Sequence, residues 1–363
     1  MAVGGSSTRR FVKTFLANKL ANRGYPYFGS LEVTRRCNSR CAFCPIGNEK
    51  KEIKEGEAGT DAMKRVLSQF AEMNIIAVSF LGGEPFLRKD VCELAEYSCQ
   101  RGMITQVSTN GLNLGPIVGE STAAFDVIVI SLDATDAELY REIRGVDRFD
   151  TVLENIKAAR DLSEENRCKI LLNTVICSKN LEQVPDLIRL TKDLDLGGIM
   201  IDFATFHDYW SGKLDEKSRY NPEEMDWRNR LTETKDLVRE IIRMKPDYPI
   251  LTSRAYLETF LSDDLDFKCY PSLFCCVRRD GQVAIPCWDA TCTKYFDIVN
   301  EHELREVWFS DEARELREKV ADCSSCFMHC IVEPSKVLGA TTRNLKDMVE
   351  WVNTFRSGAF SAY

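Results

Sequence analysis

Short apolar runs alternate with longer amphipathic stretches between residues 31 and 203. Runs of strand length stand at Leu31–Val33, Ile75–Leu81, Ile104–Ser108, Val127–Ser131, Ile170–Ile176 and Ile199–Phe203. Between them, helical spacing of apolar residues covers Asp61–Met73, Lys89–Cys99, Val152–Asp161 and Leu181–Leu194. This alternation predicts an α/β fold with a parallel sheet and helices on its outer face. Because a closed barrel of this type needs eight strands, we expect a partial (β/α)6 TIM-like barrel.

The pattern divides the chain into five parts. We assign the barrel to residues 29–205, a charged helical segment to 206–264, a small cysteine-rich domain to 265–335 and a closing helix to 336–363. Residues 1–28 predict a basic amphipathic helix, since no acidic residue precedes Glu32 while five basic residues do: Arg9, Arg10, Lys13, Lys19 and Arg23. Such a helix either docks on the barrel or contacts an anionic membrane surface.

Charge and cysteine content narrow the class of protein. The net charge is −8 over 363 residues, which argues against general binding to nucleic acid, because phosphate contacts need a basic surface. The 15 cysteines are odd in number, follow no secretory signal and cluster in the sequence. In a chain of this length they predict metal binding in the cytoplasm rather than a disulfide framework. No apolar run is long enough to span a membrane.

Three cysteines in one loop give the strongest chemical signal. Cys37, Cys41 and Cys44 have the spacing C-x3-C-x2-C. Three thiolates this close suit an iron–sulfur cube that keeps one iron without a protein ligand. Zinc is the competing interpretation, but zinc sites usually pair their cysteines as C-x2-C or combine them with histidines. The spacing therefore favours a cluster.

Polar and glycine-rich runs follow three of the next strands. The first is Gly82-Gly83-Glu84-Pro85, in which the glycines allow a ligand to approach the backbone and Glu84 can accept hydrogen bonds from an ammonium group. The others are Ser108-Thr109-Asn110-Gly111 and Ser131-Leu132-Asp133. Their hydroxyl, amide and carboxylate groups suit a ribose, although the same residues are common in turns and helix caps.

Together these runs resemble the radical S-adenosylmethionine (radical SAM) superfamily over about residues 31–203. Phe43 before the third cysteine and Ile143-Arg144-Gly145 add to the resemblance. It implies a [4Fe–4S] cluster on Cys37, Cys41 and Cys44. It also implies S-adenosylmethionine held through Gly82, Gly83 and Glu84 at the methionine amine, through Phe43 at the adenine, and through Asn110, Ser131 and Asp133 at the ribose.

The C-terminal cysteines resemble the SPASM and Twitch domains of the same superfamily. That resemblance implies at least one auxiliary cluster, expected to be [4Fe–4S], on Cys269, Cys287, Cys323 and Cys326. Because the series stops at Cys330, the shorter Twitch-like form with one cluster is favoured. Cys330 either replaces one of these ligands or serves the substrate. Cys275 and Cys276 are interpreted as buried strand residues, with an alternative role as a ligand in place of Cys269.

The resemblance implies an enzyme that cleaves S-adenosylmethionine reductively and takes hydrogen from an unactivated position of a small molecule or peptide. An electron donor such as flavodoxin or ferredoxin would reduce the core cluster, and the auxiliary cluster would accept an electron from the substrate. Two alternatives remain: a lipid substrate, suggested by the basic first segment, and a non-catalytic iron–sulfur carrier. The sequence does not identify the general base, for which Arg144 and Asp202 are candidates by position.

Overall fold

The computed structural model describes residues 24–206, 213–262, 269–288, 290–320, 323 and 327–338. In this part of the chain one sheet of nine strands has the order β6-β5-β4-β3-β2-β1-β7-β8-β9. Neighbouring strands from β6 to β7 are parallel, while β7, β8 and β9 pair in antiparallel fashion. The strands are β1 (Phe28–Thr34), β2 (Ala77–Gly82), β3 (Ile104–Thr109), β4 (Val127–Ser131), β5 (Lys169–Ile176), β6 (Gly198–Phe203), β7 (Phe274–Val277), β8 (Gln282–Ile285) and β9 (Lys294–Asp297).

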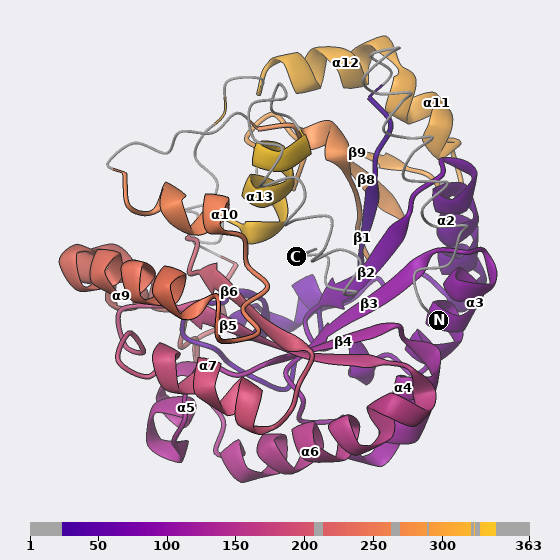
Figure 1. The fold of residues 1–363 in the computed structure, drawn as a ribbon. Coiled ribbons are helices and arrows are strands. Elements are labelled where there is room, and N and C mark those ends of the chain that lie inside the picture. The colour runs from indigo at the N-terminus through magenta and orange to yellow at the C-terminus, as the bar shows by residue number, and fades with distance from the viewer. Residues whose placement is uncertain are drawn as a thin grey trace.

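Helices connect the parallel strands and lie along the outer face of the curved sheet (Figure 1). The helices between β1 and β6 are α2 (Thr60–Glu72), α3 (Val91–Gln100), α4 (Val118–Ala124), α5 (Ala137–Arg144), α6 (Phe149–Asn166) and α7 (Val184–Asp193). Those that follow are α8 (Pro222–Met225), α9 (Leu231–Met244), α10 (Arg254–Thr259), α11 (Leu304–Phe309), α12 (Asp311–Glu318) and α13 (His329–Leu338). Short 3-10 turns stand at Ile46–Asn48, Lys51–Lys54, Pro85–Leu87, Gly115–Ile117, Trp227–Arg230 and Pro271–Leu273.

The predicted fold class is confirmed. All six strands and all four helices expected from the sequence are present, with ends shifted by a few residues. The sequence pattern missed α4 and α5, which are only 7 and 8 residues long. Local capping explains α5: the Asp136 side chain accepts hydrogen bonds from the backbone N–H groups of Glu138 and Leu139, both at 2.9 Å, and Gly145 ends the helix with φ +71.

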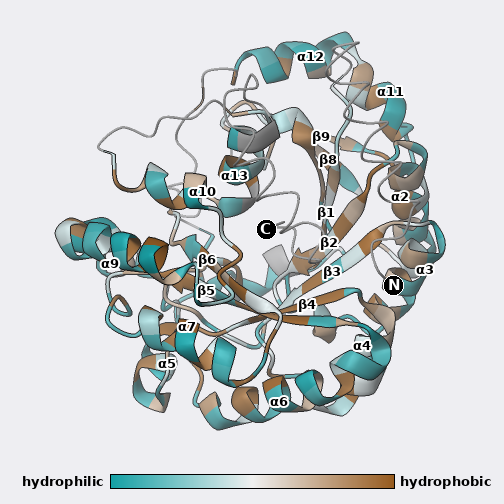
Figure 2. Cartoon of the chain, viewed as in Figure 1, coloured by the Kyte–Doolittle hydropathy of each residue, from teal (hydrophilic) through white to brown (hydrophobic). Residues whose placement is uncertain are grey.

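The strands are apolar on both faces, as expected for a parallel sheet covered on both sides. In β4, Ile128 and Ile130 belong to the large core beneath the helices, whereas Val127 and Val129 belong to a separate cluster on the inner face. Figure 2 shows the strands mainly in hydrophobic colours and helices such as α6 and α12 mainly in hydrophilic ones. The carboxyl ends of the strands carry polar residues, and these build the site described below.

The C-terminal region continues the barrel sheet. β7 pairs in parallel with β1, Gly29 opposite Cys275, so the predicted cysteine-rich domain and the barrel share one sheet. Helix α13 lies on the open side of the sheet, in contact with β6 and α10 (Figure 1). Most of the predicted basic N-terminal helix (1–28) and closing helix (336–363), namely residues 1–23 and 339–363, lies outside the described residues. Residues 24–28 are not helical, and residues 336–338 form the end of α13. No helix in the described part of the chain is long and apolar enough to cross a membrane.

Candidate functional site

The loop that carries the three cysteines, residues 37–44, follows β1 and is held by the end of α5. The backbone N–H of Arg40 donates to the carbonyl of Arg144 at 3.2 Å, and that of Ala42 donates to the carbonyl of Ile143 at 2.8 Å. The loop therefore pairs with the Ile143-Arg144-Gly145 run that the sequence analysis singled out. This pairing brings residues about 100 positions apart to the same place.

Five N–H donors lie near the cysteine sulfurs, and two of them, the backbone N–H groups of Ile46 and Gly47, donate to Cys44. The backbone N–H of Ser39 lies 3.4 Å from Cys37 Sγ, and the side-chain amide of Asn110 lies 4.0 Å from the same atom. Arg144 Nη1 lies 3.8 Å from Cys41 Sγ. Hydrogen bonds to ligand sulfurs stabilise thiolates and tune the potential of an iron–sulfur cluster. The donors thus fit the cluster that the cysteine spacing predicts.

The protein alone does not favour thiolates in this loop. Burial raises the pKa of Cys37, Cys41 and Cys44, that of Cys41 to about 11 even though Arg144 lowers it. A cysteine that ligates metal is deprotonated, because the positive charge of the metal replaces the lost proton. Loading of a cluster here would therefore release protons.

Asn48 stabilises the backbone of the cysteine loop, a role that no sequence pattern indicates. Its side-chain amide donates to the carbonyls of Cys41 and Cys44 at 3.0 and 2.9 Å. Its carbonyl oxygen accepts from the backbone N–H of Arg219 at 2.8 Å. Since Asn48 is fully buried, it fixes the backbone between the second and third cysteines.

The two glycines after β2 lie directly against the backbone that leads into the cysteine loop. A Cβ atom on Gly82, whose φ is +137, would lie 2.0 Å from the carbonyl oxygen of Thr34, and one on Gly83 would lie 2.1 Å from that of Arg36. The glycines are therefore required for close packing of two strand ends. Their backbone N–H and C=O groups border the loop on the side of β2.

Glu84 is fully buried and its carboxylate accepts three hydrogen bonds from the protein. They come from the Thr109 hydroxyl at 2.7 Å and from the backbone N–H groups of Asn110 at 2.7 Å and Phe86 at 3.1 Å. Burial nevertheless raises the pKa of Glu84 to about 7. Glu84 thus ties the end of β2 to the end of β3, and its contact with a methionine amine stays a prediction.

Asn110 at the end of β3 is turned toward the cysteine loop. Its side-chain amide donates to Asn38 Oδ1 at 2.7 Å and to Ser39 Oγ at 3.1 Å. Ser131, at the end of β4, is half-buried. Both residues thus lie at the carboxyl ends of neighbouring strands, and their contact with a ribose remains a prediction.

Arg144 joins three predicted site residues. Its Nε lies 2.5 Å from Asp133 Oδ2, and its guanidinium lies 5.6 Å from the centre of the Phe43 ring as well as near Cys41. Asp133 also accepts a hydrogen bond from the backbone N–H of Val175 at 2.8 Å. Asp133 therefore holds Arg144 in place, whereas the sequence analysis considered it only as a ribose contact.

A single metal ion is a poor match for this loop. Within the described ranges, no three or more His, Cys, Asp and Glu side chains are arranged to hold one metal ion. A cluster binds its thiolates at separate irons, so it does not need the sulfurs to converge on one point.

Comparison with protein families agrees with this site. The profile of the radical SAM superfamily matches residues 31–191. These residues form a radical SAM domain. The match begins in β1 and ends in α7, and it includes Cys37, Cys41, Cys44, Gly82–Glu84, Asn110 and Asp133.

Related proteins share this domain. The AdoMet-dependent heme synthase of Methanosarcina barkeri is 28% identical over 206 residues, which is 56% of each chain. The PqqA peptide cyclase of Bradyrhizobium diazoefficiens is 32% identical over 176 residues, 47% of this chain and 45% of the relative. These matches span about half the length of either relative.

Solved structures share the fold over a larger part of the chain. SuiB of Streptococcus suis, determined bound to S-adenosylmethionine, superimposes with a TM-score of 0.65 and 18% identity, and covers 86% of this chain and 72% of SuiB. At this identity the likeness concerns the fold. It extends beyond the radical SAM domain, because residues 31–191 are a smaller share of the chain.

Beyond the radical SAM domain, three of the predicted auxiliary ligands lie close enough to interact. The thiol of Cys269 is buried, and Cys287 and Cys323 both raise its pKa further, to about 12. These residues come from the segment before β7, the segment after β8 and the segment before α13. Cys326 lies outside the described residues, as does the side chain of Cys330.

Cys275 and Cys276 are buried strand residues, as the sequence predicts. Cys275 is fully buried in the large core, and Cys276 is buried on the opposite face of β7 with Cys269. Cys292 is partly buried against the large core. Of the two strand cysteines, only Cys276 shares a packing cluster with Cys269, so Cys276 is the alternative ligand on the correct face.

A buried network of charges joins the radical SAM domain to the β7–β8 turn. Arg35 pairs with Glu49, Nε to Oε2 at 2.9 Å, and with Glu32, Nη1 to Oε2 at 2.8 Å. Arg279 Nη1 reaches the other oxygen of Glu32 at 3.0 Å. The sequence analysis did not reveal this network, because Arg279 lies 247 positions from Glu32 along the chain.

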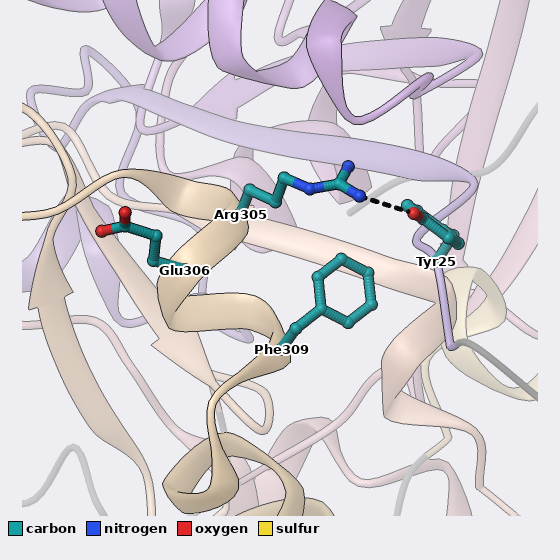
Figure 3. Close-up of a pocket in the computed structure, with 4 residues that line it drawn as sticks. All are labelled: Tyr25, Arg305, Glu306 and Phe309. Carbon is teal, nitrogen blue, oxygen red and sulfur yellow. Dashed lines mark hydrogen bonds between the residues drawn. The ribbon is translucent and has the colours of Figure 1, made fainter.

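Several hollows lie on the surface of the described part of the chain. One of 590 Å³ opens beside the cysteine loop, lined by Asn38, Leu112, Asn113, Thr151 and residues 146–148. A second, of 510 Å³, is lined by Tyr25, Arg305, Glu306 and Phe309 (Figure 3). In the second hollow Arg305 donates to the Tyr25 hydroxyl at 3.0 Å, and no predicted site residue lines it. It therefore belongs to the packing of α11 against the segment before β1.

Proposed function

We propose that this protein is an enzyme that cleaves S-adenosylmethionine reductively and removes a hydrogen atom from an unactivated position of its substrate. The observation that carries the proposal is the gathering of Cys37, Cys41 and Cys44 with the ends of β2, β3 and β4, in a radical SAM domain. A carrier of iron and sulfur would need the thiolates alone.

The proposed ligands of a [4Fe–4S] cluster are Cys37, Cys41 and Cys44. When bound, the cluster supplies the electron that splits S-adenosylmethionine into methionine and a 5′-deoxyadenosyl radical, which takes hydrogen from the substrate. Arg144 stabilises the Cys41 thiolate and, being held by Asp133, keeps a positive charge beside it. Asn48 and the Gly82-Gly83 backbone fix the position of the loop.

S-adenosylmethionine would lie above the carboxyl ends of β1 to β4. In the proposed arrangement Gly82, Gly83 and Glu84 contact the methionine amine, Phe43 contacts the adenine, and Ser131 contacts the ribose. Asn110 and Asp133 support the site indirectly. Asn110 binds residues of the cysteine loop, and Asp133 binds Arg144. The protein's contribution is positioning and exclusion of water.

We further propose one auxiliary cluster on Cys269, Cys287, Cys323 and Cys326, with Cys330 as a further candidate. The effect of Cys287 and Cys323 on the ionisation of the Cys269 thiol supports the first three. A cluster with four protein ligands accepts an electron rather than binding S-adenosylmethionine. The net reaction would then be an oxidation or the formation of a bond with loss of hydrogen.

The proposed substrate class is a peptide or a small molecule. Relatives of the radical SAM domain include a PqqA peptide cyclase and an AdoMet-dependent heme synthase by name. An electron donor such as a flavodoxin or ferredoxin would reduce the core cluster. The hollow beside Asn38 supports the approach of the electron donor there, because Asn38 adjoins Cys37, which is only partly buried.

The test is anaerobic reconstitution with iron and sulfide, followed by dithionite and S-adenosylmethionine. We expect about eight irons per chain and release of 5′-deoxyadenosine. The Cys37/Cys41/Cys44→Ala triple variant should keep about four irons, those of the auxiliary cluster, and release no 5′-deoxyadenosine. Clusters without product in the unaltered chain would favour the carrier hypothesis instead. About four irons per chain, with 5′-deoxyadenosine still released, would contradict the proposal of an auxiliary cluster.

A further inference from the structure

Asn173 and Asp202 stand on neighbouring strands and face the interior of the barrel. On β5, Asn173 lies opposite Met200 of β6, and Asp202 follows two residues later on the same face of β6. Met200 packs with Val127, Val129 and Leu171 on that inner face. The two polar residues therefore lie one step nearer than this apolar cluster to the carboxyl end of the sheet, where the cysteine loop also lies.

Both side chains present an oxygen that lacks a hydrogen-bond partner. Asn173 is 1% exposed and Asp202 is 8% exposed. Among the described residues, Asn173 Oδ1 and Asp202 Oδ2 have no hydrogen-bond partner. Buried polar atoms in folded proteins are nearly always paired with the protein, water or a ligand. Two such acceptors on adjacent strands, near the carboxyl end of the sheet, indicate a place for a donor.

The rest of Asp202 already has a structural role. Its Oδ1 accepts a hydrogen bond from the backbone N–H of His329, the first residue of α13, at 3.2 Å. The imidazole of His329 pairs with Glu333, which also accepts from the backbone N–H of Ser253 at 2.9 Å. Oδ1 therefore anchors α13 to β6, and Oδ2 is not needed for that anchor.

The missing partner of Asp202 is best supplied by a cation. The Asn173 side chain donates to the Asp202 carboxylate, and the positive charge of His329 is shared between Asp202 and Glu333, so one imidazolium faces two buried carboxylates. Burial of a carboxylate is costly unless a positive charge compensates it. An alkylammonium would donate to both free oxygens at once, whereas a carboxylate-bearing group would be repelled.

We propose that Asp202 and Asn173 form a subsite that binds a positively charged amino group of the substrate. This inference rests on the proposed function, and it narrows the substrate to a molecule or peptide with an amine. A lysine side chain and a free amino terminus both present the group. The carboxyl ends of β5 and β6 would then orient the substrate while the ends of β1 to β4 hold the cofactor.

Binding of small probes to the reconstituted full-length chain, with S-adenosylmethionine and without reductant, tests the subsite. The probes are n-butylammonium, n-butanol and n-butyrate, and dissociation constants are measured by ligand-observed NMR titration. We expect butylammonium to bind at least about tenfold more tightly than butanol, because a hydrogen bond to a charged group is stronger than a neutral one. Butyrate should bind most weakly. Equal affinities for butylammonium and butanol would overturn the proposal.

Asp202→Asn removes the charge while leaving an oxygen to accept from His329. It should weaken butylammonium binding about tenfold and leave butanol binding unchanged. Asp126→Asn is the matched control, since Asp126 accepts from the backbone N–H of Thr105 before β4, at the opposite end of the sheet. If Asp202→Asn does not fold, Asn173→Leu decides the question, and unchanged butylammonium binding in it would overturn the proposal.

Release of 5′-deoxyadenosine separates this inference from the proposed function. The unaltered chain should release 5′-deoxyadenosine in the absence of substrate, and this release is measured on the same preparation as butylammonium binding. If the unaltered chain releases 5′-deoxyadenosine but does not bind butylammonium selectively, the subsite proposal alone is overturned. Selective binding without cleavage in the unaltered chain would remove the proposed function and leave the subsite.

Discussion

The guanidinium of Arg144 pairs with the carboxylate of Asp133 at 2.5 Å between Nε and Oδ2, inside the carboxyl end of the barrel. Both side chains are nearly inaccessible to solvent. From this position Arg144 Nη1 reaches the sulfur of Cys41. A fixed positive charge beside a cluster thiolate favours the reduced, more negative state of the cluster.

Replacing Arg144 with Gln should therefore lower the midpoint potential of the core cluster. Loss of a hydrogen bond to a charged group, worth roughly 1.5–3 kcal/mol, corresponds to a shift of about 60 mV or more for one electron. EPR-monitored redox titration of the reconstituted chain measures it. Arg141→Gln, on the exposed side of the same helix, is the control. An unchanged potential in Arg144→Gln would contradict the assigned contact.

Gly83→Ala should impair loading of the core cluster. The added Cβ would lie 2.1 Å from the carbonyl oxygen of Arg36, which is backbone and cannot rotate away. The residues entering the cysteine loop would have to move. Gly119→Ala in α4 is the matched control, because no atom lies within 4 Å of its Cβ, and it should stabilise the helix by roughly 0.5–1 kcal/mol. Iron content per chain distinguishes the two variants, and equal content would refute the prediction.

Cys269→Ala should remove the auxiliary cluster and leave the core cluster intact. Iron should fall from about eight to about four per chain, while 5′-deoxyadenosine release continues. Cys275→Ala is the control, since Cys275 lies in the same short segment but packs in the large core. It should keep about eight irons. Loss of iron from Cys275→Ala, with retention in Cys269→Ala, would exchange the roles of these residues.

The barrel could be predicted from sequence because its signals are local. Strand-length apolar runs and helical periodicity are read within a few residues, and the predicted strands agree with β1 to β6. The pairing of β7 with β1 could not be predicted in the same way. It joins Gly29 to Cys275 across most of the chain, and four-residue strands such as Phe274–Val277 carry little periodicity.

The residues of the candidate site likewise fall into those with a local sequence signal and those that depend on tertiary contacts. Cys37, Cys41 and Cys44 were identified by spacing, and the polar residues near them by their place at strand ends. Asn48 and the pairing of Asp133 with Arg144 depend on tertiary contacts. Because Asn and Asp have many local uses in turns and caps, a single sequence does not reveal which of them holds a loop in place.

Glu84 should make stability depend on pH in the chain without clusters. Burial raises its pKa from 4.5 to about 7, so the folded state binds the proton more tightly than the unfolded state does. The free energy of unfolding should therefore fall as the pH rises from 4.5 toward 7, by roughly 3 kcal/mol. The difference between the unaltered chain and Glu84→Gln in urea unfolding, measured across this range, isolates the effect. Glu165→Gln on the surface is the control, and a flat difference would contradict the assignment.

Arg279→Met should destabilise the junction between the barrel and the β7–β8 turn. Arg279 is 6% exposed and its partner Glu32 is 4% exposed, so the variant leaves part of a buried charge without compensation. Breaking such a pair costs about 3–5 kcal/mol, although Arg35 still binds Glu32 and reduces the loss. Urea unfolding of Arg279→Met, Glu32→Gln and the double variant measures the coupling.

The neighbouring Arg278 provides the control for this comparison of the single and double variants. It pairs with Asp280 at 3.4 Å and is partly exposed, so Arg278→Met should cost less than about 1 kcal/mol. If the network fixes the turn, hydrogen exchange in β7 and β8 should also rise in Arg279→Met and not in Arg278→Met. Strictly additive effects of the Glu32 and Arg279 substitutions would show that the pair does not couple the two regions.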